Sequence, residues 1–225
     1  MTAFRAAWQG GANWLETDVQ PSMDNVPILI HDDDVDRTTD GSGAVRETRA
    51  LDLARLDAGS WFAPEFAGEP IPELAQLLAA LPAEQRIFLE IKGPHTAEQV
   101  LAILQVCRAS GVDDRVLLQS FQRDTLATVR EIAPDRAVGL LTENWDDDPI
   151  AACRDLGAIS YNPHHRLLRQ QPDPAAAVTA LQRAGIAVSV WTADDESDWE
   201  FLTELGVDAI MTNKPAALAD WLGSR

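Results

Sequence analysis

The chain has 225 residues, of which 36 are acidic and 18 are basic, giving a formal net charge of −18. This excess argues against nucleic acid and anionic membrane surfaces as general partners, because both would repel the protein. Hydrophobic residues make up 46% of the chain and charged residues 24%, so the composition allows a buried core and does not indicate disorder. An anionic substrate would need a local positive group, such as a metal ion.

The sequence also predicts a location. No apolar run approaches the roughly 18–20 residues of a membrane-spanning helix, and the N-terminus shows no signal peptide. Cys107 and Cys153 stand alone in predicted helices, without the close spacing of a redox motif, so we expect two buried, reduced thiols. These features predict a soluble, cytoplasmic protein.

The first third of the chain contains a helix, a strand and a long irregular segment. Residues 2–10 predict a helix that ends at Gly10 and Gly11, and the run "NWLETDV" at 13–19 predicts a strand. Residues 33–70 are rich in turn residues, and we expect them to form an insertion of short helices and loops. A new helix should begin near Pro72.

From residue 87 onward, short apolar runs and helical segments alternate at intervals of roughly 20–25 residues. The predicted strands are "RIFLEIK", "RVLLQSF", "RAVGLLT", "GAISYNP", "IAVSVWT" and "VDAIMTN", and the predicted helices include 96–110, 123–133, 175–184, 195–205 and 214–222. Thr96 and Gln99 predict a capping box, and Gly111 and Gly206 stand where helices should end. This alternation is typical of parallel strands covered by helices.

Counting residues 13–19, the chain contains seven such strands, and an eighth would complete a TIM (β/α)8 barrel. A βα unit needs a strand before its helix, so the missing strand should precede residue 1. We therefore predict one barrel domain over residues 1–225 that lacks its first strand and carries an insertion at 33–70 after its second. Exposed strand edges favour pairing with another chain, so we also expect self-association.

Acidic residues gather around one histidine near the start of the chain. Glu16 and Asp18 are two apart on a predicted strand and therefore point to the same face. A turn at residues 23–25 would fold the segment into a hairpin that puts residues 30–32 opposite residues 18–16, with His31 beside the acidic pair. Glu90 ends the next barrel strand, and Lys92 follows on the same face.

Three carboxylates that converge at strand ends need a counter-charge. Each pair costs about 1 kcal/mol at ~4 Å in water, and about 4 kcal/mol at an effective dielectric of 20. A divalent cation removes this penalty, and oxygen ligands without cysteine favour Mg²⁺ or Ca²⁺ over zinc. Such sites occur at the C-terminal ends of TIM-barrel strands. The acids at 33, 34 and 36 are interpreted as a solvated loop face.

Several segments resemble the glycerophosphodiester phosphodiesterase family. They are "FRAAWQGGANWLETDVQ", "VPILIHDDDVDRTTDGSG", "LDAGSWF", "IPELAQLL", "FLEIK", "QSF", "VSVWT" and "GVDAIMTNKP", in family order over nearly the whole chain. The resemblance implies a TIM barrel of the phosphatidylinositol-phosphodiesterase-like type. It also implies one divalent cation, Mg²⁺ or Ca²⁺, as cofactor.

The resemblance assigns roles to the residues found above. It implies that Glu16, Asp18 and Glu90 hold the metal, that His31 acts in acid–base catalysis and that Lys92 helps to hold the phosphate. Trp191 is a candidate wall against the glycerol carbons, or an ordinary barrel-end aromatic. The implied reaction converts a small glycerophosphodiester to glycerol 3-phosphate and an alcohol through a cyclic phosphate.

Some family motifs are absent from the chain. The family has a second catalytic histidine in an "HRG" motif, followed by a "PEN" segment, and neither occurs here. His95, His164 and His165 lie in other contexts, and we interpret each as a surface loop residue. The closing "TDxP" pattern reads Thr212-Asn213-Lys214-Pro215, which puts any charge role there in doubt.

Two other functions compete with this one. A sphingomyelinase-type phospholipase D of the same superfamily would be secreted and often disulfide-bonded, and neither feature is predicted here. A non-catalytic binding protein derived from the family is the alternative that the missing histidine and arginine motif supports.

Overall fold

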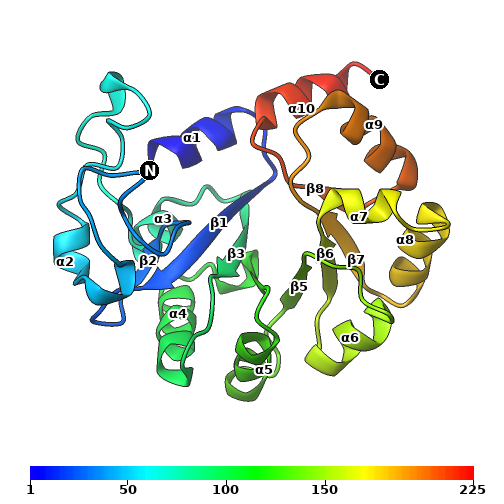
Figure 1. Ribbon diagram of the computed structural model, residues 1–225, viewed down its shortest axis with the longest axis horizontal. Helices are drawn as coiled ribbons and strands as arrows, with labels where there is room; N and C mark the ends of the chain where they lie inside the picture. The colour runs from blue at the N-terminus through cyan, green and yellow to red at the C-terminus, as the bar shows by residue number, and fades with distance from the viewer. The chain divides into compact units, whose positions relative to one another are not determined.

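The computed structural model describes residues 1–225 and divides them into two compact units. Unit 1 contains Met1–Trp8 and Asn13–Leu117, and unit 2 contains Gln9–Ala12 and Leu118–Arg225. In both units, short strands alternate with helices along the chain, as Figure 1 shows in the colours from blue to red. The assignment of residues 1–225 to one domain stays a prediction.

Unit 1 begins with a helix, and its strands β1 to β3 lie in the order β2-β1-β3 within the sheet. The elements in chain order are α1 (Thr2–Gln9), β1 (Trp14–Pro21), β2 (Pro27–Leu29), η1 (Val45–Glu47), α2 (Ala50–Leu53), η2 (Pro64–Phe66), α3 (Leu74–Ala80), β3 (Arg86–Ile91), α4 (Ala97–Ala109) and η3 (Asp113–Arg115). Thr96 and Gln99 form the predicted capping box at the start of α4.

The two faces of β1 differ: one face is buried in the core, and the other carries acidic side chains. Leu15, Thr17 and Val19 are buried, whereas the alternate positions carry Glu16 and Asp18. β1 pairs in parallel with β3, and in this register Asp18 stands opposite Glu90. Figure 1 shows the two strands side by side. Because neighbours in a parallel pair share a face, the register brings the acidic residues of both strands to one side of the sheet.

The predicted hairpin between β1 and β2 is confirmed. The strands pair in antiparallel fashion, with Val19 opposite Leu29 and Pro21 opposite Pro27, which is the register that the sequence predicted. The turn includes Asn25, whose φ of 59° makes it the one residue other than glycine with a positive φ. Asparagine tolerates this left-handed conformation better than most residues do.

The insertion after β2 has its own small core. Val35, Val45, Leu53 and Ile71 pack with Ile28 of β2 and Ala50, all of them buried. Only short helices occur there, as predicted, and α3 begins at Leu74. Since Val35 lies in the loop after β2 and Val45 begins η1 at the end of that loop, this core fixes the path of the loop.

Unit 2 repeats a strand–helix pattern. Its elements are β4 (Val116–Ser120, which begins in unit 1), α5 (Arg123–Ile132), β5 (Val138–Thr142), α6 (Pro149–Leu156), β6 (Ser160–Pro163), α7 (His165–Arg169), α8 (Pro174–Arg183), β7 (Ala187–Val190), α9 (Glu196–Leu205), β8 (Ala209–Ile210) and α10 (Pro215–Gly223). The pairs from β4–β5 to β7–β8 are all parallel. All seven predicted barrel strands are thus present.

Other expectations from the sequence have clear outcomes. Cys107 and Cys153 are free and buried, as predicted, and burial raises the pKa of the Cys153 thiol to about 12. The helices α6 and α7 were not among those predicted by name. No helix has both the length and the apolar character needed to cross a bilayer.

Gly59 provides a test of the insertion. A Cβ atom at this position would lie 1.8 Å from the carbonyl oxygen of Phe66, so the backbone would have to move. We expect Gly59→Ala to lower the free energy of unfolding by about 1–3 kcal/mol, as overpacking does, in urea titrations. Gly223→Ala is the control, because nothing lies within 4 Å of its added Cβ atom, and it should be neutral or slightly stabilising. Equal stability of the two variants would contradict the packing described here.

Candidate functional site

Three carboxylates of unit 1 meet on one face of the sheet. One ligand oxygen from each of Glu16, Asp18 and Glu90 lies within 4.8 Å of the other two. The first two residues come from β1 and the third from the end of β3, as the parallel register requires. Glu90 is only 6% exposed, whereas Glu16 is exposed. The proximity of these side chains that the sequence predicted is confirmed.

Lys92 lies among these acids. Its Nζ atom is 3.2 Å from Asp18 Oδ1 and 3.3 Å from Glu90 Oε1, and its backbone N–H donates to Val19 of β1. Burial disfavours the charged ammonium, but the Asp18 and Glu90 carboxylates outweigh it and raise the pKa of Lys92. Lys92 is therefore a fixed positive charge beside the acidic cluster.

The carboxyl group of Glu90 is strongly perturbed by its surroundings. Burial, followed by the negative charge of Asp18, raises its pKa to about 7, against an ordinary value of 4.5. Lys92 and, more weakly, a charged His31 oppose this shift. The Lys92 ammonium carries one positive charge, whereas three ionised carboxylates would carry three negative charges. A further cation bound at the cluster would therefore be favoured.

His31 follows β2 and is paired with the next residue. Its Nδ1 atom lies 2.6 Å from Asp32 Oδ1, and 65% of its side chain is exposed. Because an ionised carboxylate can only accept hydrogen bonds, the neutral ring carries its proton on Nδ1 and leaves Nε2 free to accept one. The hydrogen bonds from Arg37 and, second, from His31 hold the pKa of Asp32 well below its usual range, so the carboxylate is ionised.

Two polar residues that were not predicted hold this region in place. Gln20 lies on the same face of β1 as Glu16 and Asp18, and its Nε2 atom lies 2.6 Å from the Asp32 carbonyl oxygen and 3.2 Å from that of His31. Arg46 of the insertion donates to the carbonyl oxygens of Lys92 and Pro94, at 2.8 and 3.1 Å. The spacing of Gln20 two residues after Asp18 was a signal for its position, whereas nothing local indicated Arg46.

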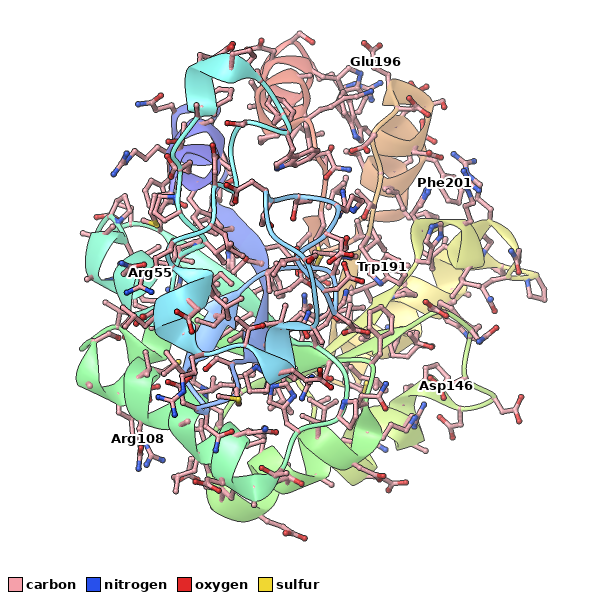
Figure 2. All side chains as sticks on the ribbon, turned by 60° about the vertical axis from the view of Figure 1, so that its left-hand side comes forward. Arg55, Arg108, Asp146, Trp191, Glu196 and Phe201 are labelled. Carbon is pink, nitrogen blue, oxygen red and sulfur yellow. The ribbon has the colours of Figure 1, made fainter.

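Trp191 belongs to unit 2 and directly follows β7, where it is labelled in Figure 2. Its indole Nε1–H donates to the Asn162 carbonyl oxygen at 2.8 Å. The ring packs edge to face against Phe121 and His164, with centroids 5.3 and 4.9 Å away. The contact of Trp191 with a substrate stays a prediction.

The interpretation of three histidines as surface loop residues needs correction. His165 begins α7, is 5% exposed and lies 3.4 Å from the Asp198 carboxylate. His95 is in a loop, but burial lowers its pKa to about 4, and its Nε2 atom is buried without a hydrogen-bond partner. His164 is partly exposed and caps α7, where its Nδ1 atom accepts from the Arg166 N–H. The local sequence context did not show the burial of His165 and its contact with Asp198, because both come from packing between segments distant in sequence.

Asn213 stands where the family pattern "TDxP" has an aspartate, and the carboxylate of Asp194 lies next to it. Its side-chain amide and backbone N–H both donate to Asp194, at 2.8 and 2.7 Å, and Thr212 donates to the same carboxylate. A negative charge is thus present beside position 213, and it comes from the segment after β7.

The chemistry of the carboxylate cluster fits one divalent cation. All the candidate ligands are oxygen atoms, which suit Mg²⁺ or Ca²⁺. Burial, followed by the charge of Asp18, raises the pKa of Glu90, and a bound cation would favour the ionised carboxylate. Asp33, Asp34 and Asp36 are exposed and are not part of the cluster. Next to this cluster, Lys92 offers a positive charge for an anion and His31 offers a proton acceptor.

Comparisons with known proteins agree with this arrangement. The model of the glycerophosphoryl diester phosphodiesterase family matches residues 1–217. A glycerophosphodiester phosphodiesterase of Caldanaerobacter subterraneus subsp. tengcongensis is 30% identical, covering 97% of this chain and 89% of the relative. A solved phosphodiesterase of Oleispira antarctica, in complex with the product sn-glycerol-3-phosphate, is 27% identical with a TM-score of 0.88, covering 99% of this chain and 89% of that one.

A further solved structure, a glycerophosphodiester phosphodiesterase of Agrobacterium tumefaciens, is 26% identical with a TM-score of 0.82 and covers 96% of this chain and 90% of that one. The alternation of parallel strands and helices in this chain and these likenesses confirm the predicted TIM-barrel-like α/β fold. The chain belongs to the glycerophosphoryl diester phosphodiesterase family.

Proposed function

We propose that this protein hydrolyses small glycerophosphodiesters to glycerol 3-phosphate and an alcohol. The observation that carries the proposal is the convergence of Glu16, Asp18 and Glu90 beside Lys92 in a member of this family. The product named for the similar Oleispira antarctica phosphodiesterase, sn-glycerol-3-phosphate, supports the same substrate class. The presence of His31 and its paired carboxylate beside these residues favours an enzyme over a non-catalytic binding protein.

Glu16, Asp18 and Glu90 would hold one divalent cation, Mg²⁺ or Ca²⁺, through carboxylate oxygens. A bound cation supplies Lewis-acid chemistry: it polarises a phosphate oxygen and lowers the pKa of a hydroxyl group. The three carboxylates contribute by fixing its place on the sheet, because two come from one strand and the third from its hydrogen-bonded neighbour. Rigid strands hold such ligands more accurately than loops do.

His31 is proposed to move protons. With Nδ1–H bonded to Asp32, the free Nε2 accepts the proton of the attacking hydroxyl group of glycerol. The phosphorus–oxygen bond to the leaving alcohol breaks as the cyclic phosphate forms, and the departing oxygen takes a proton from solvent water. After the imidazolium has returned its proton to solvent, water opens the cyclic phosphate and gives a proton to Nε2, which yields glycerol 3-phosphate. Asp32 holds the ring in orientation and stabilises its positive charge, as the carboxylate of a catalytic triad does.

Lys92 and Trp191 are proposed to bind the substrate. The Lys92 ammonium would stabilise the negative oxygens of the phosphate, on which charge increases during the reaction. In the structure it contacts two of the carboxylates, so an anion bound there would share this charge with them. Trp191 would offer an apolar surface to the glycerol carbons, and its bond to Asn162 fixes the plane of its ring.

The first prediction concerns the metal ligands. Glu16→Gln and Glu90→Gln each remove a charge from the cluster, so both should weaken the binding of Mg²⁺ or Ca²⁺ in calorimetry. In wild type, cation at ~100-fold above its dissociation constant should add about 2.7 kcal/mol to the free energy of unfolding. Asp33→Asn is the matched control, because this exposed acid lies outside the cluster. Wild-type affinity in both glutamine variants would refute the assignment.

The second prediction concerns pH. The pKa of Glu90 is raised from 4.5 to about 7, so its protonated form stabilises the metal-free protein below about pH 4.5, and this contribution is lost as the pH rises through about 7. A cation needs the carboxylate, so binding should be about tenfold tighter at about pH 8 than at about pH 6, with release of a proton. Calorimetry in buffers of different ionisation enthalpy measures both quantities. The His31→Ala variant should keep this pH dependence, and equal affinity at the two pH values would contradict it.

The third prediction separates catalysis from metal binding. His31→Ala should lower kcat for glycerophosphocholine hydrolysis by about 10²–10⁴-fold, as the loss of a general acid–base group does. Its cation affinity should stay near that of wild type, because His31 lies outside the carboxylate cluster. Loss of cation binding in His31→Ala, without a separate effect on turnover, would instead identify the histidine as a ligand.

A further inference from the structure

Arg37 binds the carboxylate that is paired with His31. Its Nε atom lies 2.6 Å from Asp32 Oδ2 and its Nη2 atom 2.9 Å from Asp32 Oδ1. The same Oδ1 atom lies 2.6 Å from His31 Nδ1. Both oxygens of one carboxylate are therefore held by a guanidinium fork, while one of them also holds the imidazole ring.

This geometry matters because His31 has little else to orient it. The side chain is 65% exposed, and its bond to Asp32 is the one hydrogen bond of the ring. The terminal torsion of an aspartate is broad, so a carboxylate held through one oxygen would turn about its axis. Two parallel bonds from a planar guanidinium fix the plane of the carboxylate, which a single ammonium cannot do.

The loop that carries Arg37 is itself fixed. Val35 and Val45 are buried in the core of the insertion, and between them the Val35 N–H donates to the Gly43 carbonyl oxygen at 3.0 Å. Thr39 Oγ1 donates to the Val35 carbonyl oxygen at 2.7 Å. The buried residues and these hydrogen bonds therefore fix the backbone near Arg37 so that its side chain reaches Asp32.

The guanidinium also has support from an aromatic ring. It lies over the ring of Trp61, with its central carbon 5.8 Å from the ring centroid. Cations are attracted to this position on an indole. Trp61 itself is 49% exposed and donates from Nε1 to the Ala58 carbonyl oxygen at 3.0 Å. The insertion thus contributes both the Arg37 guanidinium and the Trp61 ring against which it packs.

We propose that Arg37 is a positioning residue for the proposed hydrolysis, holding the Asp32 carboxylate so that His31 keeps its proton on Nδ1 and presents Nε2. The inference rests on the proposed function and assigns a catalytic purpose to the insertion. An exposed ion pair by itself contributes little to stability, and Arg37 is 59% exposed. Loss of Arg37 should therefore change the tautomer and orientation of the His31 ring, and should change the stability of the fold little.

The matched control is Arg55, which is labelled in Figure 2 and forms an ion pair in the same insertion. It donates to Asp52 through a single contact of 3.1 Å, and both side chains are largely exposed. This pair has no contact with a histidine. Arg37→Gln and Arg37→Lys are compared with Arg55→Gln and Arg55→Lys, after thermal unfolding has shown that all four variants fold.

The first measurement is steady-state hydrolysis of glycerophosphocholine. Arg37→Gln should lower kcat by about tenfold to a hundredfold, as a misplaced catalytic group does, with KM and cation affinity near wild type. Arg37→Lys should not restore the rate, because it keeps the charge and loses the fork. Guanidinium ions, far below denaturing concentrations, should partly restore Arg37→Ala and should not restore Asp32→Asn. The Arg55 variants should behave as wild type does.

The second measurement does not need activity. Long-range ¹H–¹⁵N spectra of the histidine side chains, of which the chain has four, report which ring nitrogen carries the proton. Wild type and the Arg55 variants should show His31 protonated on Nδ1, and Arg37→Gln should show a mixture of tautomers. A wild-type His31 spectrum in Arg37→Gln overturns the proposal, as does a wild-type kcat in that variant.

The two measurements also separate this proposal from the proposed function. If the wild-type chain did not hydrolyse glycerophosphodiesters but the His31 spectrum changed in Arg37→Gln, the positioning role would stand and the assigned reaction would fail. If hydrolysis occurred and depended on His31 but not on Arg37, the reaction would stand and the positioning role would fail.

Discussion

The mutual repulsion of three carboxylates is the constraint on which the site depends. Glu16, Asp18 and Glu90 lie within 4.8 Å of one another, a separation at which each charged pair costs about 4 kcal/mol at an effective dielectric of 20. Separate loops would move apart to relieve such a cost. Here the parallel register of β1 and β3 prevents that movement, because Asp18 and Glu90 are partners in the ladder. Burial, together with the charge of Asp18, therefore raises the pKa of Glu90, and Lys92 contacts both carboxylates.

A single strand supplies both the core and the site. The odd-numbered positions 15, 17 and 19 of β1 are buried, and the even-numbered positions carry Glu16, Asp18 and Gln20. Gln20 then fixes the backbone of the segment that contains His31 and Asp32. The placement of the histidine relative to the acids thus depends on the same hydrogen-bonded hairpin that closes β1 onto β2.

The parts of the site that obey a short period could be predicted from the sequence. Two-residue alternation placed Glu16 and Asp18 on one face, and counting residues about Asp24 in the turn gave the register of the hairpin. Both inferences work because strand geometry is local and regular. The same holds for the capping box of α4 and for most strand and helix positions in unit 2.

The residues that support the site could not be predicted in this way. Arg46 reaches Lys92 across 46 positions of sequence, and the insertion that carries it has no repeating pattern. Arg37 is only five residues from Asp32, but its return depends on the burial of Val35 and Val45. His165 was misjudged for a related reason, since its burial comes from packing in unit 2.

In and around the insertion, aspartate side chains accept hydrogen bonds from backbone N–H groups that would be paired with carbonyl oxygens in a helix or sheet. Asp36 accepts from the Gly43 N–H at 2.7 Å, and Asp57 accepts from the N–H groups of Gly59 and Ser60 at 2.9 and 3.0 Å. Asp24, in the turn before β2, accepts from the Ala50 N–H of the insertion at 2.9 Å. Short acidic side chains suit this purpose, because they reach nearby amides in turns. Some of the acidic residues of the protein therefore serve to hold the backbone of its loops. During divergence, asparagine could replace such a residue and keep the acceptor, whereas a residue without a short side-chain acceptor would leave the amide unpaired, so these positions should keep Asp or Asn even where the charge itself is lost.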